Sequence, residues 1–149
     1  MIQGFGDLNF SLTFAAIGSA LGTGVAGMAA IGAWKKAFVQ NKSAPFTLIA
    51  FVGAPLTQTI YGMILRDQII KANIPADTQT YIFQMILGAV AGLAMGVSAY
   101  MQGKAGARAS DALAETGKGF GQYIMVLGVI ETVALFVMAF CMMALPKVG

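Results

Sequence analysis

The sequence predicts an all-α membrane protein of four transmembrane helices, arranged as two duplicated helical hairpins that assemble into a homo-oligomeric ring. Of the 149 residues, 58% are hydrophobic and only 10% are charged, whereas soluble domains average about 25% charged residues. Four segments are long and apolar enough to cross a bilayer, which takes about 20 residues per helix. A chain of this length has too little interior to bury so much apolar surface, so we expect lipid to cover the remainder.

The four expected spans follow one another with short connections. We place them at about residues 8–38, 46–65, 81–100 with an extension towards Arg108, and 123–145. Residues 8–72 form the first hairpin and residues 73–149 the second, within a single membrane domain of residues 1–149. The apolar start of the chain has no preceding basic segment, so we expect no cleavable signal peptide.

The charges of the connections predict the orientation in the membrane. The first connection has three lysines and no acid: Lys35, Lys36 and Lys42. The third has a small basic excess: Lys104, Arg108 and Lys118 against Asp111 and Glu115. The middle connection is balanced: Arg66 and Lys71 against Asp67 and Asp77. Because cytoplasmic loops carry an excess of Lys and Arg, we expect the first and third connections in the cytoplasm and both termini on the non-cytoplasmic side of a multi-pass protein.

The two hairpins are internal repeats. The segment "GSALGTGVAGMAAIGAW" aligns with "GLAMGVSAYMQGKAGAR" at an offset of 74 residues, and Gln58 aligns with Glu131 at an offset of 73. In both repeats the first helix carries glycines four residues apart, which share one helix face and let helices pack closely. Such glycines indicate either ordinary packing within one chain or crowding of the first and third helices on the inner circle of an oligomer.

Glu131 in "GVIETVALF" is the only charge between Phe120 and Leu145. An ionised carboxylate at the bilayer centre costs at least about 2.5–3.5 kcal/mol, so acids inside the membrane are by default functional sites. The alternative is a protonated side chain that forms a hydrogen bond between helices.

Further polar groups are expected at the depth of Glu131. Pro55 removes a backbone donor and frees a nearby carbonyl. The expected oxygen ligands are the Glu131 carboxylate, the amides of Gln58 and Gln102, the hydroxyl of Thr57 and the carbonyl of Ala54. Hard oxygen ligands with one negative charge suit Na⁺ better than a transition metal. A proton site needs fewer ligands, but H⁺ remains the alternative, and we expect no organic cofactor.

Three motifs together resemble one known family: "PLTQTIYG" from Pro55, "YMQGKAGA" from Tyr100 and "VIETVALF" from Val129. The chain resembles the duplicated rotor-ring proteolipid (the c-type or K-type subunit) of V-type or A-type rotary ATPases, in its sodium-binding form. The resemblance implies side-chain ligands at Thr57, Gln58, Gln102 and Glu131, a backbone ligand at Ala54, and a hydrogen bond from Tyr61 that locks Glu131. It also implies one ion site per chain, because Gln58 replaces the carboxylate of single-hairpin relatives.

The same resemblance implies the partners. These are identical protomers in a ring, a stator membrane subunit with an arginine, central stalk subunits at the cytoplasmic loops, and the lipid of a prokaryotic plasma membrane. The protein itself would carry no catalytic residue and bind no nucleic acid. Two other classes remain open from the residues alone: a four-helix cation or drug antiporter, and a structural or pore-forming four-helix protein.

Overall fold

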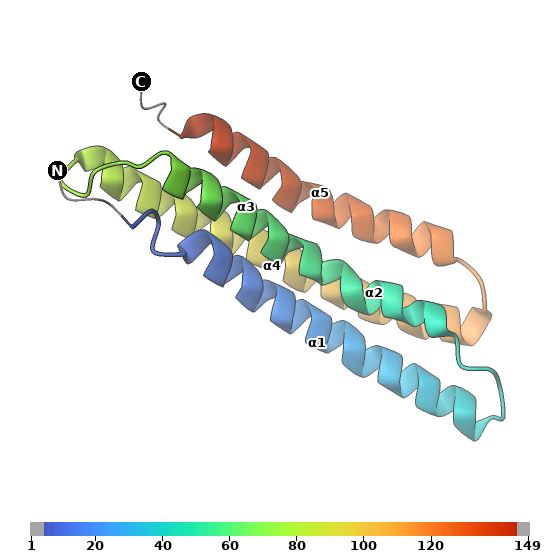
Figure 1. Cartoon of the computed structure of the whole chain (residues 1–149). Helices are drawn as coiled ribbons and strands as arrows, with labels where there is room; N and C mark the ends of the chain where they lie inside the picture. The colour runs from blue at the N-terminus through green and yellow to red at the C-terminus, as the bar shows by residue number, and fades with distance from the viewer. Residues whose placement is uncertain (1–4, 146–149) are drawn as a thin grey trace.

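The computed structural model describes residues 5–145 as an elongated helical bundle in which consecutive rods run in opposite directions (Figure 1). Helix α1 spans Phe10–Val39, α4 spans Gln79–Thr116 and α5 spans Phe120–Ala144. Between α1 and α4 lies a second helical rod made of η1 (Phe46–Leu48), α2 (Ile49–Gly53), η2 (Ala54–Leu56) and α3 (Thr57–Lys71). All four rods are long and apolar enough to cross a membrane. The predicted all-α fold class with four spans is therefore confirmed.

The first helix begins two residues later than predicted. Leu8 and Asn9 have positive φ angles of 54° and 64°, so the regular helix starts at Phe10. Asp7 is fully buried, and its Oδ2 accepts a hydrogen bond of 2.8 Å from the backbone N–H of Ser11. This bond satisfies one of the amide groups that a helix N-terminus leaves without an intrahelical partner.

Pro55 tightens the second rod without ending it. The residues around the proline form the 3₁₀ segment η2, and the helix then continues to Lys71, beyond the predicted end at Leu65. A proline cannot donate to the carbonyl four residues before it, and a short 3₁₀ turn accommodates that loss. The backbone N–H of Thr57 donates to the Ala54 carbonyl within this turn.

The prediction for the end of the third span was wrong. Helix α4 continues to Thr116 and stops at Gly117, which has a left-handed φ of 67°. Of the charged residues assigned to the third connection, only Lys118 lies between α4 and α5. The other four lie on α4: Lys104, Arg108, Asp111 and Glu115. The segment from Lys104 is rich in alanine and exposes its charges on one face while Gly106, Ala109, Ser110 and Leu113 are buried, which is the pattern of an amphipathic helix.

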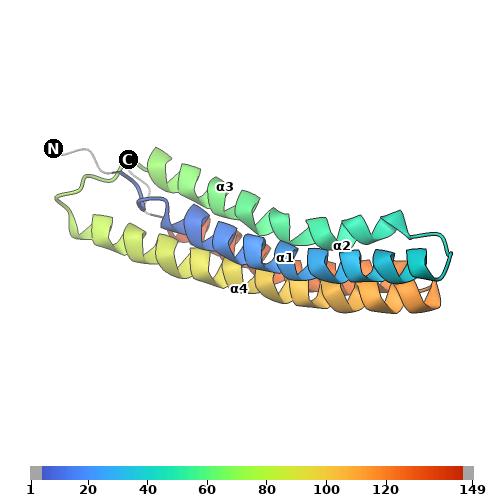
Figure 2. The same cartoon turned by 90° about the horizontal axis from the view of Figure 1, so that it is seen from below.

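Helices α1 and α4 pack backbone against backbone through glycines (Figure 2). A Cβ atom on Gly18 would overlap the backbone of Gly96, and one on Gly103 would overlap the backbone of Gly22. The predicted close packing of the first and third spans is thus present within a single chain. By contrast, Gly24 and Gly32 on α1 have open space around their Cβ positions.

Helices α1 and α5 lie at opposite edges of the bundle, with the second rod and α4 between them (Figure 1). Helix α3 packs on α1 at Gly62, where an added Cβ would lie 2.7 Å from the Ser11 carbonyl oxygen. Helix α5 packs on α4 and α3. Two apolar clusters, one containing Phe51 and Leu127 and the other containing Leu65 and Ala134, flank the middle of the bundle. The polar residues of the site lie between these clusters.

Candidate ion-binding site

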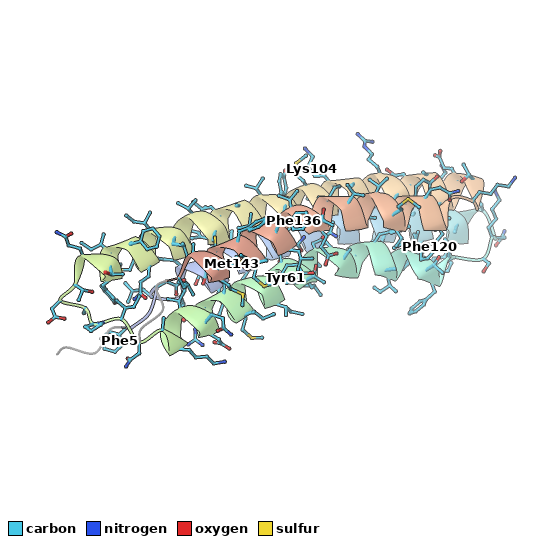
Figure 3. The ribbon with its side chains drawn as sticks, turned by 90° about the horizontal axis from the view of Figure 1, so that it is seen from above. Phe5, Tyr61, Lys104, Phe120, Phe136 and Met143 are labelled. Carbon is cyan, nitrogen blue, oxygen red and sulfur yellow. The ribbon has the colours of Figure 1, made fainter. Side chains whose placement is uncertain are left out.

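Glu131 receives hydrogen bonds from two other helices near the middle of the bundle. The side chain is half-buried on α5. Its Oε1 accepts a 2.7 Å hydrogen bond from the Tyr61 hydroxyl on α3. Its Oε2 accepts a 3.2 Å hydrogen bond from Gln102 Nε2 on α4. Figure 3 places Tyr61 between Phe5 at one end of the molecule and Phe120 towards the other, so the carboxylate lies far from both ends of the spans.

Two fully buried glutamines join the carboxylate to the second rod. Gln102 Nε2 also donates to the Leu127 carbonyl at 3.0 Å, and Gln102 Oε1 accepts from Gln58 Nε2 at 2.9 Å. Both amides therefore have defined orientations, because each uses its NH₂ group on a neighbouring oxygen. The prediction that Gln58, Gln102 and Glu131 lie at one depth is confirmed by these contacts.

Three oxygen atoms meet at the proline turn. Thr57 Oγ1 lies 3.0 Å from the Ala54 carbonyl oxygen and 3.2 Å from Gln58 Oε1. The hydroxyl has a single proton, so it can donate to only one of these acceptors at a time. The Ala54 carbonyl, expected to be free, accepts the backbone N–H of Thr57 as well as facing its hydroxyl. A carbonyl, an amide oxygen and a hydroxyl oxygen thus converge beside Gln58.

Ser98 is a member of this network that was not predicted from the sequence. Its side chain is 5% exposed, its Oγ donates to the Ile130 carbonyl at 2.9 Å, and Gln58 Nε2 lies 3.5 Å from the same oxygen. Ser98 precedes Gln102 by four residues, so both side chains lie on one face of α4. The sequence alone carried no signal for this contact, because a serine in a helix can also bond to its own backbone. The hydrogen bond from Ser98 to Ile130 joins α4 to α5 at the level of Glu131.

No cation balances Glu131 in the described part of the chain. The two ion pairs within residues 5–145 join Lys36 to Glu115 and Arg66 to Asp67. The groups that contact the carboxylate, Tyr61 and Gln102, are neutral donors. A charged carboxylate held in lipid needs a counter-ion or a proton. The surrounding amide, hydroxyl and carbonyl oxygens are the ligand types that hard cations prefer.

All six residues named from the sequence therefore lie in one network across three rods: Ala54, Thr57, Gln58, Tyr61, Gln102 and Glu131. Their role as ion ligands stays a prediction.

A comparison with known families finds a match in the second hairpin. Residues 85–144 match the family described as the ATP synthase C subunit. The matched segment contains all of α5 and most of α4, and hence both Gln102 and Glu131. Proteins of this family form homo-oligomeric rings in the membrane and carry ions as a rotor turns. With four membrane-spanning helices and this match, the chain is similar to the ion-carrying rotor proteolipids.

Proposed function

We propose that the chain is the rotor proteolipid of a V-type or A-type rotary ATPase and carries one Na⁺ per chain at Glu131. The observation that supports this proposal is the carboxylate itself, which is contacted by neutral donors and joined to a cluster of amide, hydroxyl and carbonyl oxygens. Binding of Na⁺, the transported ion, makes the site neutral overall. ATP hydrolysis elsewhere in the assembly drives the ring that these chains form.

Each residue has a distinct part in this proposal. Glu131 supplies the negative charge, and the oxygens of Gln102, Gln58, Thr57 and Ala54 replace the water around the ion. Tyr61 keeps its 2.7 Å hydrogen bond to Glu131 Oε1, so it holds the carboxylate in place without being a ligand. Rigid oxygen ligands on three packed rods suit a small cation, because they are ordered before the ion arrives.

The charge of Glu131 couples ion movement to rotation. With Na⁺ bound, the site is neutral and can pass through lipid. Without the ion, the carboxylate is charged and is stabilised only near a positive group, which the arginine of a stator subunit would provide. Each unit charge moved through 100 mV corresponds to about 2.3 kcal/mol. Several ions are therefore transported for each ATP hydrolysed.

The proposal also orients the protein in the membrane. Helices α1 and α4 line the inside of the ring, while the second rod and α5 face lipid and the stator. The connections at residues 40–45 and 117–119 lie in the cytoplasm and contact the central stalk, and the termini lie on the non-cytoplasmic side of a prokaryotic plasma membrane.

Carbodiimide labelling of the purified protein tests the choice of ion. We expect Glu131 to be labelled within the membrane and to be protected by Na⁺ but not by K⁺ at the same ionic strength, because bound Na⁺ covers the carboxylate. The Glu131→Gln variant should lack this labelling and is the control for labelling elsewhere. Labelling of Glu131 that depends on pH but not on Na⁺ would show instead a rotor that carries H⁺.

A further inference from the structure

Helix α5 has little apolar packing within its own chain. Of its residues, all of which the structure describes, Leu127 and Ala134 alone are buried. In the most apolar 18 residues of each span, 11% are buried in α5 against 44% in α4. Because apolar contact is non-directional, so small a buried area constrains the rotation of α5 about its own axis only weakly.

Two hydrogen bonds from α4 supply directional contacts to α5. Ser98 Oγ donates to the Ile130 carbonyl at 2.9 Å, and Gln102 Nε2 donates to the Leu127 carbonyl at 3.0 Å. The donors are four residues apart on α4 and the acceptors three apart on α5, so both bonds lie along one line of contact. Each carbonyl oxygen has two lone pairs, so it can accept a side-chain donor in addition to its bond within the helix.

The bond from Ser98 acts on the peptide group that carries Glu131. The Ile130 carbonyl and the Glu131 backbone nitrogen belong to one planar peptide unit, so holding that carbonyl also holds the Glu131 Cα. The end of a side chain lies about 5–6 Å from a helix axis, so a rotation of α5 by about 20° moves the carboxylate by about 2 Å. The hydrogen bonds of 2.7 Å to Tyr61 and 3.2 Å to Gln102 would not survive such a movement.

The direction of the Ser98 bond is set by its two neighbours. Gln58 Nε2 lies 3.5 Å from Ser98 Oγ and can only donate, so it occupies the acceptor side of the hydroxyl. The single hydroxyl proton is therefore directed to the Ile130 carbonyl, which can only accept. Neither neighbour is the Glu131 carboxylate, so the bond is available whether the site is empty or occupied.

We propose that Ser98 is a positioning residue for the ion site: its hydroxyl fixes the rotation of α5 and thereby the place of the Glu131 carboxylate between Tyr61 and Gln102. This role rests on the proposed function, because it gives Ser98 an effect on Na⁺ binding without making it a ligand. Removing the hydroxyl leaves the charge and every expected ligand oxygen in place. Na⁺ affinity should nevertheless fall, because the carboxylate is then no longer held at one position before the ion binds.

Carbodiimide labelling of Glu131 at increasing Na⁺ concentration tests this role. Ser98→Ala should raise the Na⁺ concentration that prevents half of the labelling by about three- to tenfold, the range of one neutral hydrogen bond. Ser98→Thr keeps the hydroxyl and should bind Na⁺ like the wild type. Ser110→Ala is the matched control, because it removes a fully buried hydroxyl of α4 that donates to the Gly106 carbonyl of the same helix. The control should leave the required Na⁺ concentration unchanged.

A double-mutant cycle with Tyr61 separates positioning from a general loss of stability. Tyr61 and Ser98 lie on different rods and share no hydrogen bond within residues 5–145. If Ser98 acts through the position of Glu131, its loss also weakens the bond from Tyr61. Tyr61→Phe should therefore raise the required Na⁺ concentration by a smaller factor in the Ser98→Ala variant than in the wild type.

Two kinds of failure are distinguishable. Additive effects in the cycle, or half-protection of Ser98→Ala at the wild-type Na⁺ concentration, would overturn the positioning role while the ion site stands. Equal effects of Ser98→Ala and Ser110→Ala, or a failure of Ser98→Thr to restore binding, would overturn it as well. A wild-type protein whose labelling does not depend on Na⁺ would contradict the proposed ion site itself, and with it the role of Ser98.

Discussion

Replacing Gln102 by alanine tests whether the amide network holds the ion. Gln102 is fully buried, donates to Glu131 Oε2 at 3.2 Å and to the Leu127 carbonyl at 3.0 Å, and accepts from Gln58 at 2.9 Å. Gln102→Ala removes one ligand oxygen and leaves the charge of Glu131 in place. One lost contact to a charged partner costs about 1.5–3 kcal/mol. Because about 1.4 kcal/mol corresponds to a factor of ten, Na⁺ should bind about ten- to a hundredfold more weakly.

The assay is carbodiimide labelling of Glu131 in the purified protein at increasing Na⁺ concentration. The quantity measured is the Na⁺ concentration at which half of the labelling is prevented. Ser110→Ala is the matched control on the same helix. Ser110 is also fully buried, but its hydroxyl donates 3.0 Å to the Gly106 carbonyl, two turns away from Gln102. The control should leave the Na⁺ concentration for half-protection unchanged, whereas Gln102→Ala should raise that concentration. If both variants are protected at the wild-type Na⁺ concentration, Gln102 is not a ligand and the reasoning from this network is wrong.

Three further variants probe the site and its support. Tyr61→Phe loses the 2.7 Å hydrogen bond to Glu131, so carbodiimide should label Glu131 faster at a given Na⁺ concentration, and an unchanged rate would contradict the locking role. Thr57→Ala removes one oxygen but no charge, so ATP hydrolysis in the assembled enzyme should still occur but need about tenfold more Na⁺. If the variant needs the same Na⁺ concentration as the wild type, Thr57 is not a ligand. Gly96→Ala forces α4 away from α1 at the Phe14 carbonyl and should lower the thermal midpoint, whereas Gly53→Ala, with open space around it, should not.

The centre of the site was predictable from the sequence because few residues there are polar. Glu131 is the only charge on its span, and Gln58 aligns with it in the repeat at an offset of 73. The second rod and α5 run in the same direction, and depth along each follows from the rise of about 1.5 Å per residue, so Gln58 could be placed level with the acid. The hydrogen bonds from Tyr61 and Gln102 to the two different carboxylate oxygens needed the structure.

Ser98 shows why the remainder of the site was not predictable. A serine within a helix often bonds to its own backbone four residues earlier, as Ser110 does with Gly106. Nothing in the pattern distinguishes that local bond from the bond that Ser98 makes to Ile130 on α5. The choice depends on which neighbouring helix lies within reach, and this is set by the packing of the whole bundle.

The glycines and the length of α4 show the same limit. Gly22 and Gly24 are both small residues on α1, yet Gly22 packs against Ala99 of α4 while Gly24 faces open space. Composition indicates that helices pack closely, but the rotation of each helix decides which glycine lies in the contact.

The end of α4 was placed too early because the apolar run ends before the helix does. The helix continues as an amphipathic segment to Thr116.

The number of Na⁺ ions bound per chain tests the central claim most directly. Titration of the purified protein with a sodium isotope should reach one Na⁺ per chain, because Glu131 is the one acid in the network of amide and hydroxyl oxygens within residues 5–145. Glu131→Gln should bind none, while Ser110→Ala should still bind one. A wild-type protein that binds no Na⁺, or that binds two ions per chain, would contradict the account.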